Sequence, residues 1–122
     1  MKKLFLFLLF SSVLASCDPL INVDFNVKND SGKSIMVILS KDTSLIENGS
    51  EKTIYHESDI GSTDEFIDNL EFLPFDTLFI SNDSAQLYNK DPMDADRWTK
   101  TKPKKKSGLG TVVLTIVPDD FE

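Results

Sequence analysis

Apolar and polar residues alternate along much of the chain with a period of two, the pattern of a β-strand with one buried face. The clearest case is the segment 21–28, where the odd positions are Ile, Val, Phe and Val and the even positions are Asn, Asp, Asn and Lys. Residues 111–117, 53–57 and 75–82 are further strand candidates. The run 34–40 is apolar on both faces, which predicts a strand near the middle of a sheet.

Polar segments rich in turn-forming residues separate these strands. Asn29–Lys33 contains Gly32, and either Asn29 or Gly32 is suited to a positive φ angle. We therefore expect a β-hairpin between the first two strands. Residues 41–52 are polar and contain an Asn-Gly pair, so we expect a loop there. Residues 119–122 are expected to be an acidic tail.

Two short helical turns are predicted between the strands. Ser62 and Glu65 have the spacing of a capping box, which predicts a short helix up to Leu70. Asp91 followed by Pro92 is a typical start signal, and we expect it to open a helical turn that holds the only tryptophan, at position 98.

The elements together predict an all-β fold. We expect an antiparallel β-sandwich or a partly open barrel of five to six strands, with one or two short helical turns. Residues 21–122 have the length of a single domain, long enough to bury a core without disulfide bonds.

The first 20 residues have a different character. A basic start, Met1-Lys2-Lys3, is followed by an apolar stretch and then by Leu14-Ala15-Ser16-Cys17, which resembles the lipobox of bacterial lipoprotein precursors. The apolar stretch is shorter than the roughly 20 residues that cross a bilayer. We expect residues 1–16 to be removed as a signal peptide, and residues 17–20 to form the lipidated cysteine and a short tether. Lipidation of Cys17, the only cysteine, also accounts for an unpaired thiol in an exported chain.

The sequence resembles small uncharacterised lipoproteins of the Bacteroidetes type. The likeness is carried by the lipobox, by residues 25–33 (Phe-Asn-Val-Lys-Asn-Asp-Ser-Gly-Lys), by residues 75–78 (Phe-Asp-Thr-Leu) and by residues 114–118 (Leu-Thr-Ile-Val-Pro). It implies a β-rich envelope lipoprotein with a diacylglyceryl thioether on Cys17, usually with a further acyl chain such as palmitate on the new amino terminus. It brings no catalytic residues. Surface-exported members usually carry an acidic cluster after the cysteine, whereas this chain has only Asp18 before Pro19. The resemblance therefore favours an outer-membrane position facing the periplasm.

Charge narrows the choice of partners. The formal net charge of the chain is −7, and loss of Lys2 and Lys3 with the signal peptide takes it to −9. Nucleic-acid binders present a basic face to phosphates, so this balance argues against a nucleic-acid partner.

The residue inventory offers little catalytic chemistry. His56 is the only histidine, and a histidine-dependent nucleophile needs a partner acid and a nucleophile beside it. One histidine and one lipidated cysteine also exclude zinc sites built from these ligands. Asp91, Asp94 and Asp96 offer oxygen ligands for calcium, but their spacing is not that of an EF-hand loop. We expect neither a catalytic residue nor a bound metal or other cofactor beyond the covalent lipid.

Two surfaces remain as candidates for binding. A basic loop could contact anionic lipid head groups through Lys100, Lys102, Lys104, Lys105 and Lys106, although a solvated loop is the simpler interpretation. Trp98, Tyr88 and Tyr55 could form an exposed platform for a glycan or a peptide, although core packing is the commoner use of such rings.

The leading hypothesis is a membrane-anchored envelope lipoprotein that works without catalysis, as a binding or accessory module. Its partners would be the membrane, through the lipid anchor, and an envelope protein or glycan. The alternative is a glycan- or peptide-binding domain that uses exposed aromatic side chains. A hydrolase is disfavoured, because a chain of this size has little room for a cleft with two carboxylates.

Overall fold

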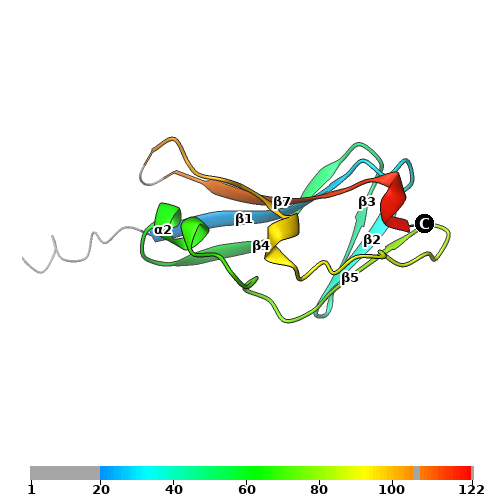
Figure 1. Cartoon of the computed structure of the whole chain (residues 1–122), viewed down its shortest axis with the longest axis horizontal. Coiled ribbons are helices and arrows are strands. Elements are labelled where there is room, and N and C mark those ends of the chain that lie inside the picture. The colour runs from blue at the N-terminus through cyan, green and yellow to red at the C-terminus, as the bar shows by residue number, and fades with distance from the viewer. Residues whose placement is uncertain (1–19, 106–107, 122) are drawn as a thin grey trace, which may run out of the picture.

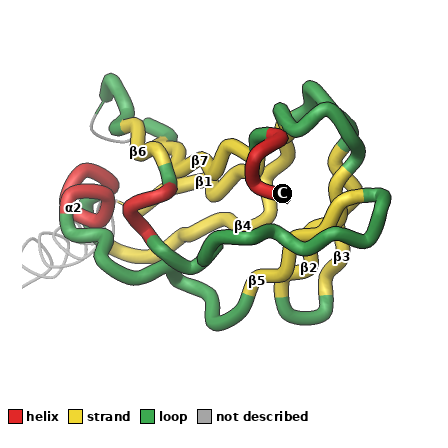
Figure 2. Tube along the Cα trace, turned by 45° about the vertical axis from the view of Figure 1, so that its right-hand side comes forward, coloured by secondary structure: helices red, strands yellow, loops and turns green. Residues whose placement is uncertain are grey.

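The computed structural model describes residues 20–105 and 108–121. These residues form seven strands in two sheets, with one short α-helix and two 3-10 turns (Figures 1 and 2). The larger sheet has the order β4-β1-β7-β6 and comprises β1 (Leu20–Asn29), β4 (Glu51–Ile60), β6 (Thr99–Thr101) and β7 (Gly110–Ile116). The smaller sheet has the order β3-β2-β5 and comprises β2 (Ile35–Leu39), β3 (Asp42–Ile46) and β5 (Leu78–Asn82). The predicted all-β sandwich is confirmed.

Alternate residues of both sheets form a single core, as the sequence pattern requires. The larger sheet contributes Val23, Phe25, Val27, Val112, Leu114 and Ile116, and the smaller sheet contributes Ile35, Val37, Leu39, Ile46, Leu78 and Ile80. The larger sheet extends beyond the smaller one toward α2 (Thr63–Asp68), as Figure 1 shows. There α2 packs on β1 and β7, so Ile67 and Thr63 cover that end of the core.

The larger sheet contains a parallel pair where antiparallel pairing is predicted. β1 pairs with β4 in antiparallel fashion but with β7 in parallel, with Val23 opposite Gly110 and Asn29 opposite Ile116. The strand count is seven, because two short edge strands lie in segments expected to be loops. β3 has a single buried residue, Ile46, and β6 has none, so neither has the apolar pattern that marks a strand in the sequence.

The first two strands do not form the expected hairpin, because β1 and β2 belong to different sheets. The turn between them is organised by Asn29, the last residue of β1, which is fully buried. Its Nδ2 donates to the carbonyl oxygens of Lys33 (2.7 Å) and Ile46 (2.9 Å), and its Oδ1 accepts from the backbone N–H (3.0 Å) and hydroxyl (2.6 Å) of Ser31. Asn29 therefore ties the end of the larger sheet to the smaller sheet. Gly32 takes the positive φ, +88°.

The helical elements agree with the sequence in part. Ser62 caps α2 as predicted, accepting from the Glu65 N–H (3.4 Å), but the helix ends at Asp68. The second helical turn, η1 (Ala95–Arg97), begins at Asp94 rather than at Asp91. Its cap is Asp94 because the Asp94 carboxylate accepts from the Asp96 N–H (3.1 Å).

The expected acidic tail is also wrong for the residues that are described. Pro118–Phe121 form a 3-10 turn, η2, in which Asp120 and Phe121 are buried. Asp120 accepts from the backbone N–H of Val117 (2.9 Å) and pairs with Lys90, so this carboxylate fastens the chain end to the 89–90 segment.

Candidate functional site

The outer face of the smaller sheet carries apolar side chains where a polar face is usual. Met36 of β2 lies opposite Leu45 of β3 and Ser81 of β5, and Ile38 lies opposite Thr43 and Phe79. Leu87 adds to the first row, because it forms an isolated bridge with Ser81. Paired residues project from the same side of a sheet, so these side chains are neighbours. We call this surface the apolar sheet face; its apolar members are Met36, Ile38, Leu45, Phe79 and Leu87.

The apolar sheet face is open to solvent. Four of its side chains are 41–69 % exposed, with Met36 the least and Leu87 the most exposed. The inward residues of the same strands, Val37 and Ile80, are almost completely buried, so the core does not need the outward set. Contiguous exposed apolar patches on soluble domains mark interaction sites.

The outer face of the larger sheet gives a comparison within the same molecule. Its central strand β1 presents Asn22, Asp24, Asn26 and Lys28 outward, while Val23, Phe25 and Val27 are buried. Asp24 lies opposite His56, whose Nδ1 is 2.6 Å from the Asp24 carboxylate. One outer face is thus polar and hydrogen-bonded, and the other is apolar. Exposure to water accounts for the polar outer face of the larger sheet, but it does not account for the apolar sheet face.

A second group of exposed apolar side chains lies at the other end of the molecule, where β1 begins (Figure 1). Leu20 pairs with Ile60 at the end of β4, and Leu109 directly precedes β7. Phe72 lines an open groove of about 470 Å³ between α2 and the start of β1, together with Ile21 and Gly61. We call Leu20, Ile60, Phe72 and Leu109 the tether end; they are 46–83 % exposed.

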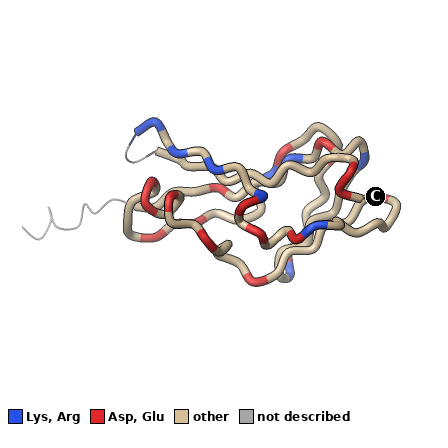
Figure 3. Tube along the Cα trace, in the orientation of Figure 1, with Lys and Arg blue, Asp and Glu red and all other residues tan. Residues whose placement is uncertain are grey.

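The predicted basic loop reaches toward the tether end. Figure 3 shows its basic residues along the β6–β7 connection and acidic residues around α2. Lys104 and Lys105 are exposed, and Lys100 is half-buried. Lys102 bonds to Asp68 of α2 (2.6 Å), and this hydrogen bond is the main cause of the raised pKa of Lys102. Lys106 lies outside the described residues, as do Cys17 and the predicted signal peptide.

The predicted aromatic platform does not have an exposed tryptophan. Trp98 is 3 % exposed and packs in an edge-to-face cluster around Phe25, at a centroid distance of 6.2 Å. Tyr55 is half-buried on the same cluster, 5.8 Å from Phe25. Tyr88 is separate from it and packs against Phe121 (6.4 Å). Trp98 and Tyr55 therefore cover Phe25 on the central strand, and Tyr88 lies outside this cluster.

Both tyrosines have altered acidity. Burial raises the pKa of Tyr55, and the carboxylate of Glu57 raises it further. Burial also raises the pKa of Tyr88, with the nearby Asp120 charge acting in the same direction.

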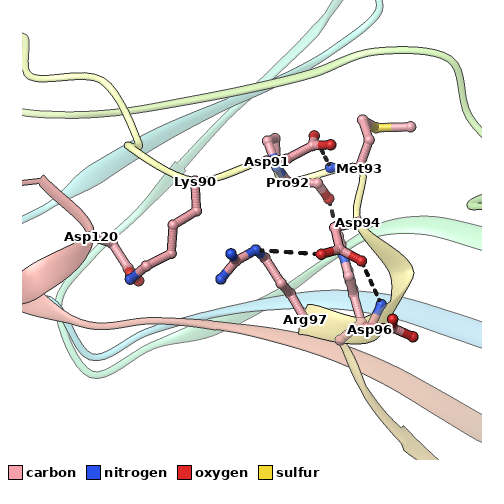
Figure 4. Close-up of polar contacts among 9 residues, drawn as sticks. Lys90, Asp91, Pro92, Met93, Asp94, Asp96, Arg97 and Asp120 are labelled. Carbon is pink, nitrogen blue, oxygen red and sulfur yellow. Dashed lines mark hydrogen bonds and ion pairs between the residues drawn. The ribbon is translucent and has the colours of Figure 1, made fainter.

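Two of the three aspartates considered as calcium ligands, Asp91 and Asp94, accept hydrogen bonds from the backbone of their own loop (Figure 4). Asp91 accepts from the Met93 N–H (2.9 Å), and Asp94 caps η1 and lies 3.8 Å from Arg97. Asp96 is exposed. Within the described residues there is no group of three or more His, Cys, Asp or Glu placed to hold a metal ion.

No protein-family model matches the chain, and the searches of curated proteins and of solved structures gave no match either. In the described part of the chain, none of the helices has the length and apolar character needed to cross a membrane.

The apolar sheet face was missed by sequence reasoning. A signal for it was present: residues 35–39 are apolar on both faces, and in a two-layer sandwich one of those faces must point outward.

Proposed function

We propose that this protein is a lipid-anchored lipoprotein of a bacterial envelope that acts without catalysis, as a binding module for another envelope protein. The observation that carries the proposal is the apolar sheet face, which lies at the opposite end of the molecule from the start of β1. An anchor at Cys17 would hold the tether end near the bilayer and leave the apolar sheet face accessible.

The chemistry of the apolar sheet face favours a protein over a glycan. Sugars are bound by exposed aromatic rings together with polar groups, and Trp98, the candidate for such a ring, is in the core. Met36, Leu45 and Leu87 offer flexible aliphatic surface, and Phe79 offers an aromatic anchor. Aromatic residues and Met are enriched in protein interfaces.

The lipid anchor is tested by the intact mass of the protein recovered from membranes. We expect the mass of residues 17–122 with a diacylglyceryl group and a further acyl chain, and we expect a Cys17→Ala variant to be unprocessed or soluble. An unmodified cysteine in the membrane-derived protein would refute this part of the proposal.

The binding face is tested by photo-crosslinking in cells. Met36 is replaced by p-benzoylphenylalanine, and the control places the same residue at Thr115, which is exposed on the outer face of the larger sheet. We expect a discrete protein adduct from position 36 that is absent from position 115. The adduct should disappear when Phe79→Ser is added, because Phe79 belongs to the same face. Equal adducts from both positions would contradict the assignment of the face.

A further inference from the structure

We propose that the tether end docks directly on anionic lipid head groups, so that the domain is seated on the bilayer rather than swinging from its anchor. This inference rests on the proposed function, in which Cys17 carries the lipid. The seat consists of Leu109, the lysines at positions 104 and 105 that precede it, and the neighbouring Leu20–Ile60 pair.

The first support is the covalent reach of the chain. Only Asp18 and Pro19 lie between Cys17 and Leu20, the first residue of β1, and the three extended steps from Cys17 to Leu20 span about 10 Å. The lipid-bearing sulfur of the anchor lies at the membrane–water boundary. The start of β1 therefore stays within about 10 Å of the head groups in any conformation of the residues between.

The second support is the apolar character of the side chains exposed near the start of β1. Leu20 and Ile60 are register partners at the ends of β1 and β4, and each exposes more than half of its side chain. Leu109 is 46 % exposed and directly precedes Gly110, which pairs with Val23 near the start of β1. These side chains lie at one end of the larger sheet, where the interfacial region of a bilayer would cover them.

The third support is charge. Lys104 and Lys105 are exposed, and neither takes part in a salt bridge among the described residues. Acidic residues also lie at this end: Asp59 is exposed beside Ile60, and α2 carries Asp64, Glu65 and Asp68, of which Asp68 pairs with Lys102 of the lysine loop. Anionic lipid attracts the first group and repels the second. The docked orientation is therefore the one that brings Lys104, Lys105 and Leu109 against the lipid.

The test uses the full lipidated protein, purified from membranes and reconstituted into vesicles. Cys17 is the only cysteine and its sulfur is blocked by the thioether, so Leu109→Cys supplies a single site for an NBD label. The matched control is Phe79→Cys, an exposed apolar position at the opposite end. Vesicles contain nitroxide-labelled lipid in either phosphatidylcholine with phosphatidylglycerol or phosphatidylcholine alone.

We expect lipid-borne nitroxide to quench the label at position 109 several-fold more than the label at position 79 in anionic vesicles. Charge reversal by Lys104→Glu with Lys105→Glu should lower the ratio of docked to undocked protein by at least about 25-fold, since each lysine near an anionic surface contributes about fivefold. The same pair of substitutions should have little effect in neutral vesicles.

The failures of the two proposals are distinguishable. Quenching at position 109 that is no greater than at position 79, in protein whose mass confirms the lipid, would overturn docking and leave the anchor intact. A mass without lipid, accompanied by labelling of Cys17 itself, would overturn both. Quenching that is insensitive to charge reversal would refute the role of the lysines.

Discussion

Replacing Asn29 should destabilise the connection between the two sheets more than the small size of this side chain suggests. Asn29→Ala removes the donor to the buried Ile46 carbonyl and the acceptor for the buried Ser31 N–H. The Lys33 carbonyl is less affected, because it keeps its bond from the Ser31 hydroxyl (3.0 Å). Each buried group left without a partner costs about 1–2 kcal/mol, so two such groups give roughly 3 kcal/mol.

Urea unfolding measures this loss conveniently. Trp98 is the only tryptophan and is buried in the core, so its fluorescence reports the folded state. With a denaturant slope of about 2 kcal/mol/M, a loss of 3 kcal/mol lowers the urea midpoint by about 1.5 M. The slope itself should not change, since both proteins expose the same surface on unfolding.

The chain offers a matched control in Asn48. Its side-chain oxygen accepts from the Gly32 N–H (2.8 Å) in the same turn, but this hydrogen bond is exposed to water. Asn48→Ala should therefore change the free energy of unfolding by no more than about 0.5 kcal/mol. If Asn48→Ala and Asn29→Ala lower the midpoint equally, burial does not set the strength of these bonds and the reasoning is wrong.

Two further predictions concern the packing of α2 and the response to alkali. A Cβ added at Gly110 would lie 2.5 Å from Ile67 Cδ1 and 3.0 Å from Thr63 Cγ2. Gly110→Ala should therefore displace α2 and reduce the stability measured by thermal unfolding by about 1–3 kcal/mol. An unchanged unfolding midpoint would contradict this packing. The folded-state pKa values of Tyr55 and Tyr88 are raised, so the folded protein retains protons that the unfolded chain loses near pH 10, and stability should fall as the pH rises above that value. The ionisation of both tyrosines can be followed by absorbance titration at the tyrosinate band, with Tyr55→Phe and Tyr88→Phe to assign each step. Both pH midpoints should lie above 10.0, and midpoints equal to that of the denatured chain would refute the raised pKa values.

The sequence predicts those features of the fold that depend on the local alternation of apolar and polar residues. The strand predicted at 21–28 agrees almost to its ends with β1, whereas the candidate at 75–82 is a strand only from Leu78 to Asn82. The cap at Ser62 was also predictable, because a capping hydrogen bond depends only on residues three apart.

What the sequence missed depends on contacts between distant residues. The parallel pairing of β1 with β7 leaves no local trace, and the Asn29 side chain in the turn between the two sheets has a distant partner at Ile46. The sequence left Trp98 open between an exposed platform and core packing, and its burial is decided by its contact with Phe25, which is distant in the sequence. The apolar sheet face has a sequence signal, because β2 is apolar on both sides. Its exposure could not be predicted, since that is decided by whether another segment packs over β2.

The parallel pair at the centre of the larger sheet also has a consequence for folding during synthesis. β1 has β4 on one side and β7 on the other, and β7 is the last strand of the chain to be synthesised. Until β7 has been made, one edge of the central strand is unpaired and the core lacks Val112, Leu114 and Ile116. Long-range pairing of this kind is slow to form. A nascent chain would therefore not complete the larger sheet until synthesis has passed β7.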